Sequence, residues 1–234
     1  ENQLARVEFL SGTTVVGTDT TAPYSFSWTN VPAGTYSLTA VAYDNSGASG
    51  RSSAASITVG SGSTMPAGQL SVDIGSPPIA GSTSYLNSVY TVQGSGEIFG
   101  MSDKFRFVYT QAAGDLDVVA RVVSRTNTNE WAKAGVMIRE SPAANSRDAM
   151  SFLSASKGFA FHRRPETGGI SVTNSGSSRV APGWVRLVRS GNVFQAYESG
   201  DGATWTLIAS QTITMQSGVY VGIAVTSANA GART

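Results

Sequence analysis

The stretch "GWVRLVRSGNVFQAYESGDGATWTLI", residues 183–208, has the pattern of a β-hairpin followed by a third strand. Successive side chains of a strand point to opposite faces, so every second residue shares a face. The apolar positions predict one buried face, formed by Val185, Leu187, Phe194 and Ala196. The intervening positions place a second set on the opposite face: Trp184, Arg186, Gln195 and Tyr197. A core explains the first set, and either a ligand or a covered sheet surface would explain the second.

The same alternation recurs along the chain, and almost every apolar segment is bounded by Gly, Pro, Asn, Asp or Ser. No stretch sustains the period of an amphipathic helix, so we predict an all-β protein. The strands predicted in the first part are 5–10, 14–19, 24–29, 34–44 and 55–59. Those predicted later are 90–94, 104–110, 115–123, 134–141, 149–155, 158–164, 169–174, 184–190, 193–199, 204–210 and 220–227. This density of strands favours a double-layered antiparallel sandwich.

A change in composition near residue 60 predicts two domains. The segment "GSGSTMPAG", residues 60–68, is low in apolar residues and resembles a Gly/Ser linker closed by a proline. We therefore expect a first domain over residues 1–60, a linker over 61–69 and a second domain over 70–234.

Composition excludes several classes of function. The formal net charge of +1 argues against nucleic acid or an anionic membrane as the partner. The chain contains no cysteine, so disulfides and thiolate chemistry are excluded. It also contains no apolar run of about 18 residues, so we expect no membrane span.

The first segment, "ARVEFLSGTTVVGTDTTAPYSFSWTNVPAGTYSLTAVAYDNSGASGRSSAASITV", resembles bacterial immunoglobulin-like modules that join the parts of secreted glycoside hydrolases and adhesins. The resemblance covers residues 4–59 and implies a spacer without a ligand. In such modules two further strands precede the segment at residues 5–10, so an incomplete domain is expected here.

The second segment resembles modules of the concanavalin-A-like lectin/glucanase superfamily, which are jelly-roll sandwiches of bacterial surface proteins and polysaccharide-degrading enzymes. The resemblance covers residues 73–229 and is strongest in "WAKAGVMIRES", residues 131–141, and "DGATWTLI", residues 201–208. It implies an extracellular or cell-surface location in a bacterium. Such modules continue with one more strand, so the chain is expected either to be a fragment or to complete its sheets with strands of a neighbouring copy.

Catalytic chemistry finds little support in the sequence. Glucanases of this fold use an E-x-D-x-x-E strand motif, whereas the best local match runs from Asp115 through Asp117 to Ala120, and alanine cannot transfer a proton. His162 is the sole histidine, and no nucleophile elbow accompanies it. We therefore predict that the protein is not an enzyme.

No cofactor is predicted. Calcium could be held by loop carboxylates, for which the candidates are Asp73, Asp103, Asp148 and Asp201. No EF-hand spacing supports such a site, and Asp201-Gly202 is a common dipeptide of hairpin turns.

The alternation in residues 134–141 and 158–164 adds further polar residues to those predicted on the outer face of the hairpin at residues 183–199. If these strands shared one sheet with the hairpin, one outward surface would carry Arg139, His162, Arg164, Trp184, Arg186, Gln195 and Tyr197. Aromatic rings can stack on sugar rings, and guanidinium and amide groups can bind sugar hydroxyls. The structural alternative is that the arginines cover the rings and no partner touches this surface. Trp131, at the end of a polar loop, is a further candidate, either as a ligand platform or as a cap on the sandwich edge.

These expectations favour a non-catalytic, carbohydrate-binding accessory region of a larger secreted or surface-attached bacterial protein. Polysaccharide or glycan would be its partner, with neighbouring domains or copies as further partners by strand addition. The alternative is a structural or adhesive surface protein whose domains share strands.

Overall fold

The computed structural model describes residues 3–29, 31–59 and 65–234, and these residues form strands, turns and loops without a helix. The predicted all-β fold class is therefore confirmed. The chain divides into two compact units, residues 1–64 with 85–89 and residues 65–84 with 90–234, which are described separately. The segment 61–64 of the predicted linker lies outside the described residues, whereas 65–69 is irregular up to the next strand at Leu70.

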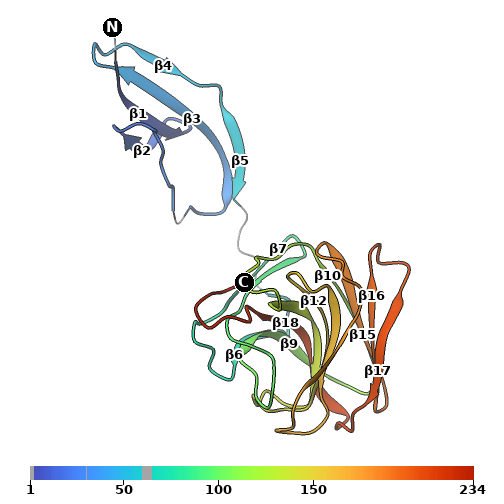
Figure 1. Cartoon of the computed structure of the whole chain (residues 1–234). Coiled ribbons are helices and arrows are strands. Elements are labelled where there is room, and N and C mark those ends of the chain that lie inside the picture. Colours follow the sequence, from blue (N-terminus) through green and yellow to red (C-terminus); the bar gives the residue numbers. More distant parts are fainter. Residues whose placement is uncertain (1–2, 30, 60–64) are drawn as a thin grey trace. The chain divides into compact units, whose positions relative to one another are not determined.

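The first unit contains one antiparallel sheet. Its strands are β1 (Leu4–Ser11), β2 (Thr14–Asp19), β3 (Gly34–Asp44), β4 (Ser49–Arg51) and β5 (Ala55–Val59). The order is β2-β1-β3-β4, and β5 also pairs with β3 (Figure 1). Among the described residues of this unit, the buried apolar ones are Val7, Leu10 and Val41. A sheet with so few buried residues has a modest core of its own.

The predicted strand at residues 24–29 is wrong. The Asp19 carboxylate accepts hydrogen bonds from the backbone N–H groups of Thr21 and Ser25, which holds this segment as a loop. The ring of Phe26 stacks on Phe9 at 6.1 Å between centroids. The alternating aromatic residues of segment 24–29 therefore indicate packing against a face of the sheet and not the pairing of a strand.

The second unit is built on two sheets. The strands of the larger sheet are β6 (Leu70–Ile74), β9 (Phe105–Ala113), β11 (Lys133–Arg139), β12 (Asp148–Ser154), β13 (Phe159–Arg164), β14 (Val172–Ser175) and β18 (Gly218–Thr226). Those of the smaller sheet are β10 (Leu116–Val122), β15 (Gly183–Ser190), β16 (Val193–Ser199) and β17 (Thr206–Thr212). Their orders are β14-β13-β12-β11-β18-β9-β6 and β10-β15-β16-β17. A separate hairpin joins β7 (Ser82–Leu86) to β8 (Val89–Gln93), and its residues 85–89 are the ones assigned to the first unit.

The core between the two sheets explains their apolar alternation. Val185 and Leu187 of β15 and Phe194 of β16 are fully buried there, as the sequence predicts. They pack against residues of the larger sheet such as Ile138 and Phe161. The second unit is therefore a β-sandwich.

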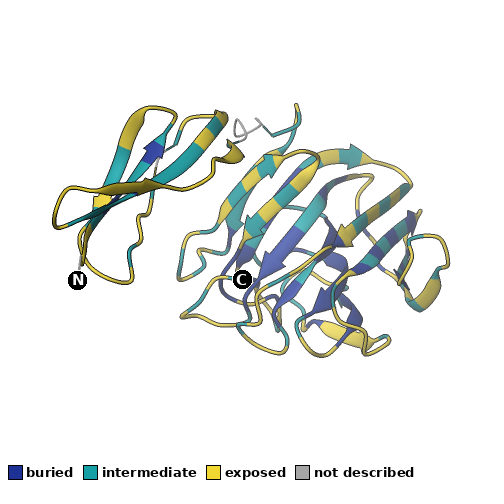
Figure 2. Cartoon of the chain, turned by 90° about the horizontal axis from the view of Figure 1, so that it is seen from above, coloured by how far each residue is buried: buried dark blue, intermediate teal, exposed yellow. Residues whose placement is uncertain are grey.

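A second core covers the other face of the larger sheet. Phe107, Met137 and Phe152 are fully buried on this face, together with Ile98 from the segment between β8 and β9. The larger sheet is consequently buried on both faces, and nearly every residue of β11 and β12 is buried. Several strands of the second unit carry the dark blue of buried residues in Figure 2. Any polar residue on these strands must find its partners inside the protein.

Candidate functional site

The surface predicted from alternation is divided between two sheets. Arg139 and Arg164 lie on β11 and β13 of the larger sheet, as does His162, and all three are fully buried. The hairpin residues Trp184, Arg186, Gln195 and Tyr197 lie on the smaller sheet and are half-buried. The prediction of one outward surface is therefore wrong. Its first three members face the second core and not solvent.

The buried arginines share carboxylate partners. Arg164 donates from Nη1 to Oδ2 of Asp103 at 2.7 Å and to Oδ2 of Asp148 at 2.8 Å. Arg139 donates to Asp103 Oδ2 at 3.3 Å and to backbone carbonyls of the following turn, Ser141 at 2.9 Å and Ala143 at 2.6 Å. Because every charge here has an opposite partner, the cluster can remain in the interior.

Asp148 and His162 lie at the end of this network. Asp148 Oδ1 and His162 Nε2 are 3.5 Å apart, and neither atom has a hydrogen bond to a described residue. Burial, aided by the nearby charge of Asp103, raises the pKa of Asp148 to about 7. Burial and the surrounding cations hold the pKa of His162 well below its ordinary value. One proton between the two atoms would satisfy both, which indicates a neutral pair.

Asp103, Asp148 and His162 also bring one potential metal-ligand atom each to within 4.8 Å of the others. Two guanidinium groups already occupy the carboxylates, however, and a cation placed there would face both of them. The other calcium candidates are also engaged, Asp73 by Arg106 at 3.4 Å and Asp201 by its own turn. The chemistry of this donor set fits a structural ion network.

On the smaller sheet, Arg186 is held in place by its neighbours. It donates to both carboxylate oxygens of Asp117, at 2.8 and 2.6 Å, and its guanidinium lies 5.3 Å from the ring centre of Tyr197 and 5.7 Å from that of Trp205. Arg121 covers Trp184 in the same way at 5.9 Å. These contacts favour the structural interpretation of this face.

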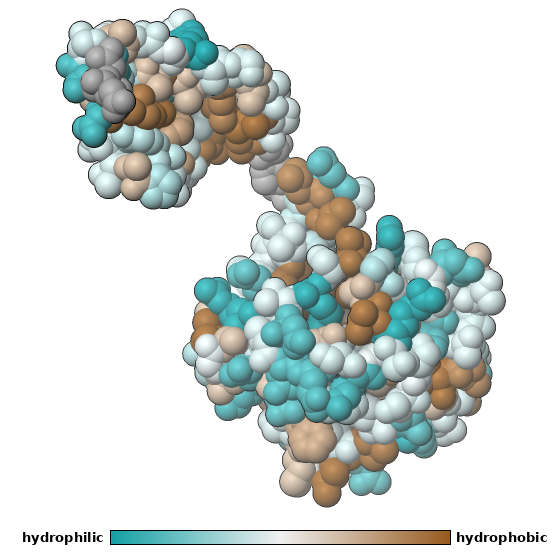
Figure 3. All heavy atoms as spheres, turned by 45° about the horizontal axis from the view of Figure 1, so that its top comes forward, coloured by the Kyte–Doolittle hydropathy of each residue, from teal (hydrophilic) through white to brown (hydrophobic). Residues whose placement is uncertain are grey.

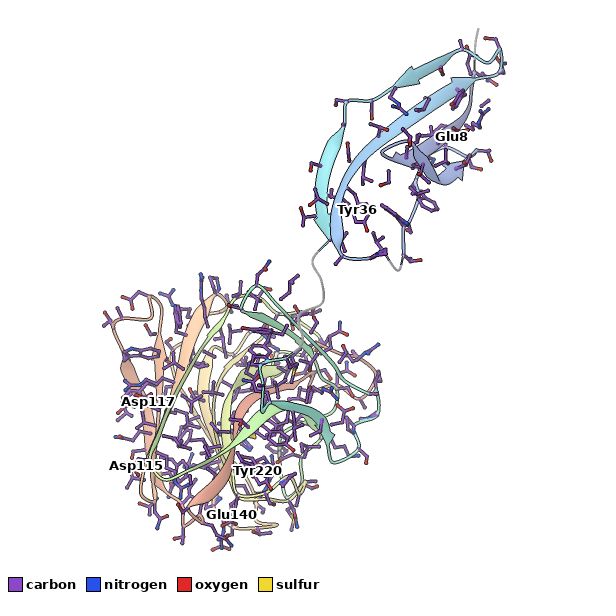
Figure 4. The ribbon with its side chains drawn as sticks, turned by 180° about the vertical axis from the view of Figure 1, so that it is seen from behind. Glu8, Tyr36, Asp115, Asp117, Glu140 and Tyr220 are labelled. Carbon is purple, nitrogen blue, oxygen red and sulfur yellow. The ribbon has the colours of Figure 1, made fainter. Side chains whose placement is uncertain are left out.

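The two carboxylates that partly match the glucanase motif, those of Asp115 and Asp117, have structural partners. Asp117 pairs with Arg186, and Asp115 accepts the backbone N–H of Gly191 at 2.7 Å. Both lie along one margin of the second unit in Figure 4.

Trp131 is half-buried and packs against the second core. Its backbone N–H donates to the Asn129 side chain at 2.8 Å, which fixes the loop end. This placement favours the cap on the sandwich over the ligand platform.

A polar cleft of about 450 Å³ opens where the smaller sheet ends. It is lined by Phe159, Ser177, Arg179, Glu198, Ser199, Gly200, Asp201, Thr204 and Thr206. These residues come from the loop before β15, the end of β16, the following turn and the start of β17, with Phe159 from β13. The volume lies within the range of about 300–1,000 Å³ common for small-molecule sites.

Hydrogen bonds fix the walls of the polar cleft. Glu198 Oε2 accepts the backbone N–H of Ser177 at 2.9 Å, which ties the loop to the end of β16. The Asp201 carboxylate accepts the N–H groups of Thr204 and Ala203, and these bonds lower its pKa. Both carboxylates are thus oriented before any ligand enters.

The guanidinium of Arg179 is a donor at the cleft without a partner among the residues the structure describes. A Cβ at Gly200 would lie 2.8 Å from its Cζ, so the guanidinium packs on the glycine backbone. Trp184 borders the same turn, because a Cβ at Gly202 would lie 2.8 Å from the indole Cε2. Trp184 is therefore the member of the predicted set that borders the turn at the cleft, although it is not among the residues that line the cleft.

Sequence reasoning missed most of the polar cleft. The segments "SGSSR", residues 175–179, and "ESGDGAT", residues 198–204, are each ordinary polar loops. Backbone bonds of Gly176 and Ser177 hold the first loop on Phe159 of β13, and the bond from Ser177 to Glu198 joins it to the second loop. The local sequence does not predict these bonds.

The fold and the cleft define an all-β sandwich protein with a polar surface site. Residues 1–40 match the model of the bacterial Ig domain family, which confirms the immunoglobulin-like prediction for that segment. No curated protein matches the sequence. A solved structure of a functionally unknown protein from Saccharomyces cerevisiae is similar with a TM-score of 0.52 and 15% identity, over 66% of this chain and 85% of that one. That likeness concerns the fold alone. Within the described residues, no helix has the length and apolar character needed to cross a membrane.

Proposed function

We propose that the chain is a non-catalytic, carbohydrate-binding accessory region of a larger secreted or surface-attached bacterial protein. In this proposal the polar cleft binds the glycan and the immunoglobulin-like first unit is a spacer. The resemblance of residues 73–229 to concanavalin-A-like modules supports the assignment, because such modules accompany polysaccharide-degrading enzymes.

The observation that carries the proposal is the set of groups around the cleft. The side chains of Ser177, Thr204 and Thr206 offer hydroxyls, and Glu198 and Asp201 offer oriented carboxylates. The Arg179 guanidinium adds a forked donor. Sugars present closely spaced hydroxyls that both donate and accept, so a mixed lining of this kind suits them.

The aromatic contact expected of a sugar site has two local candidates, Phe159, which lines the cleft but is buried, and Trp184. Trp184 borders the turn that forms one wall of the cleft, although Arg121 lies over part of its ring. The visible face of the second unit in Figure 3 is mostly hydrophilic or neutral, with apolar residues scattered over it.

The proposal is tested by retardation of the full chain in gels that contain one polysaccharide each, with and without calcium. Xylan, mannan, a β-glucan, pectin and alginate form a suitable panel. Retardation by one class is expected. Arg179→Gln should weaken it at least about tenfold, since a hydrogen bond from a charged group contributes roughly 1.5–3 kcal/mol.

Two control variants locate the site. Arg51→Gln removes an arginine of the first unit and should leave binding unchanged. Arg186→Ala with Tyr197→Ala removes the sheet face and should have a smaller effect than Arg179→Gln. If no polysaccharide retards the folded chain, the carbohydrate proposal fails.

A structural or adhesive function is the second candidate. It is favoured by the first unit, where the described residues form a single sheet with β2 at one edge and large apolar side chains such as Val15 and Phe26 exposed. Exposed edges and faces of this kind can pair with strands of another copy. Concentration-dependent polymers in sedimentation velocity would support this candidate, whereas a monomer at all concentrations would oppose it.

A further inference from the structure

Arg125, in the loop after β10, has a buried guanidinium group. All three of its guanidinium nitrogens are shielded from solvent and lack a hydrogen-bond partner in the described part of the chain. The residue as a whole is half-buried, so its exposed part is the backbone or the stem. Arginine ordinarily does the reverse, burying its stem and hydrating its charge. A buried guanidinium without a counter-charge is unfavourable and calls for a partner.

A second buried cation, Lys133, lies within range of the charge of Arg125. Lys133 of β11 is 3% exposed, and its Nζ lies 5.8 Å from the ring centre of Phe152. Burial lowers the pKa of Lys133 to about 8, and the positive charge of Arg125 acts in the same direction. Burial lowers the pKa of Arg125 to about 10. Both groups therefore remain charged near neutral pH.

Neither cation forms an ion pair among the described residues. Asp103, the buried carboxylate that also acts on Lys133, is occupied by Arg139 and Arg164. Glu97 acts on Lys133 from an exposed position, without a contact short enough for an ion pair. The positive charge of this region is therefore in excess.

The loop that carries Arg125 is held by the C-terminal segment. Thr128 Oγ1 donates to the Ser227 carbonyl at 2.9 Å, and Thr234 Oγ1 donates to the Thr126 carbonyl at 2.5 Å. Lys133 pairs with Thr226 across β11 and β18. The backbone that carries the two cations is thus anchored.

We propose that Arg125 and Lys133 form a binding site for an oxyanion, which would be the carboxylate, phosphate or sulfate group of a small ligand. The guanidinium supplies a planar fork and the ammonium a point charge, a combination suited to such a group. The partial exposure of Arg125 and the exposed Glu97 place the site just beneath the surface. It shares no residue with the polar cleft and does not depend on the carbohydrate proposal.

The experiment follows thermal unfolding of the full chain near neutral pH as sodium phosphate replaces sodium chloride at constant ionic strength. Phosphate also stabilises proteins without binding, but that effect does not saturate and is common to all variants. A saturable rise of the unfolding temperature is therefore expected for the wild type, as binding to the folded state requires. Sodium sulfate and sodium acetate distinguish the kinds of oxyanion.

Variants assign the effect to the two cations. Arg125→Gln should abolish the saturable rise and should be at least as stable as the wild type without phosphate, because an uncompensated buried charge is removed. Lys133→Met, which keeps an apolar stem against Phe152, should raise the phosphate concentration for half the effect at least tenfold. Arg51→Gln, which removes an exposed arginine of the first unit, should respond as the wild type does.

The variant Glu97→Gln distinguishes two sources of the counter-charge, an oxyanion from solution and the carboxylate of Glu97 itself. If Glu97 serves as the counter-charge, this variant loses stability without phosphate. If an external oxyanion fills the site, the variant binds phosphate more tightly, because a competing negative charge is gone. The proposal is overturned by a wild type without a saturable response, by Arg125→Gln retaining that response, or by Arg125→Gln being markedly less stable than the wild type without phosphate.

Discussion

Arg164 shows at the scale of single residues what alternation can and cannot predict. The sequence correctly places Arg164 and His162 on one side of their strand, opposite Phe161. It does not reveal that this side is covered. The partner that makes burial tolerable is Asp103, which lies 61 residues away from Arg164 in the chain. The alternation of residues predicts on which side of a strand a side chain lies. Whether that side is exposed or buried depends on segments far away in the sequence that pack against it.

Removing Arg164 should be costly. In Arg164→Leu, Asp103 and Asp148 would remain buried without their main donor, so the free energy of unfolding should fall by about 3–5 kcal/mol. The neighbouring Arg163→Leu affects hydrogen bonds at the protein surface, to Gln211 and Asn174, and should cost about 1 kcal/mol. Urea unfolding of both variants tests this, and equal losses would contradict the structural role of the buried network.

The neutral Asp148–His162 pair predicts a pH dependence with a definite sign. A carboxyl group whose pKa is raised from 3.8 to about 7 by folding binds its proton more tightly in the folded state. Its contribution to stability is therefore full below pH 3.8 and is lost as the pH rises through about 7. His162, whose pKa is lowered, contributes in the opposite direction as the pH falls below its ordinary value of 6.5.

Asp148→Asn isolates the carboxyl contribution, because asparagine imitates the protonated acid at every pH. The stability of this variant relative to the wild type should increase as the pH rises from about 4 to about 7 and then level off. Urea unfolding at several pH values measures the difference. A relative stability that decreases with rising pH would mean that Asp148 is ionised in the folded protein.

At the scale of elements, the strand pattern predicts the sandwich but not all of its strands. The hairpin predicted at residues 183–199 forms β15 and β16, and its predicted inward residues are buried. It was predicted correctly because the alternation of apolar and polar residues is long and the turn residues are easily recognised. The strands β6 and β7 were missed because each has five residues in a segment rich in Gly, Pro and Ser. Short strands of this kind depend on their neighbours for pairing.

The strand β18 offers a matched pair of glycines. A Cβ at Gly222 would lie 1.9 Å from the Val108 carbonyl oxygen of β9, whereas a Cβ at Gly218 would meet nothing within 4 Å. Gly222→Ala should therefore cost about 3 kcal/mol or more, since the backbone of β9 must move. Gly218→Ala in the same strand should change stability by less than about 1 kcal/mol. Thermal unfolding tests the contrast, and similar effects at the two positions would contradict the close packing of β9 on β18.

At the scale of the whole molecule, the two cores of the sandwich draw all their residues from 65–234. A polypeptide of residues 65–234 should therefore fold alone. Its urea midpoint, followed by the fluorescence of Trp131, Trp184 and Trp205, should equal that of the full chain. A midpoint shifted well below that of the full chain would show that the first unit is needed for stability.

The site was harder to predict than the fold for a physical reason. Trp184 was identified because it lies on a regular strand, where alternation assigns its face. Arg179 and Ser177 lie on a loop whose course is set by bonds to Phe159 and Glu198, and sequence periodicity carries no information about such bonds.

The central claim is that the polar cleft binds a glycan, and an NMR titration of the full, ¹⁵N-labelled chain tests it most directly. Neutral and acidic oligosaccharides would be added one at a time, and the backbone amide signals followed. The account predicts that one class shifts the signals of Ser177 and of Gly200 to Thr204, and that Arg179→Gln weakens the effect. Shifts confined to the face around Arg186 and Tyr197, or no shift with any oligosaccharide, would contradict it.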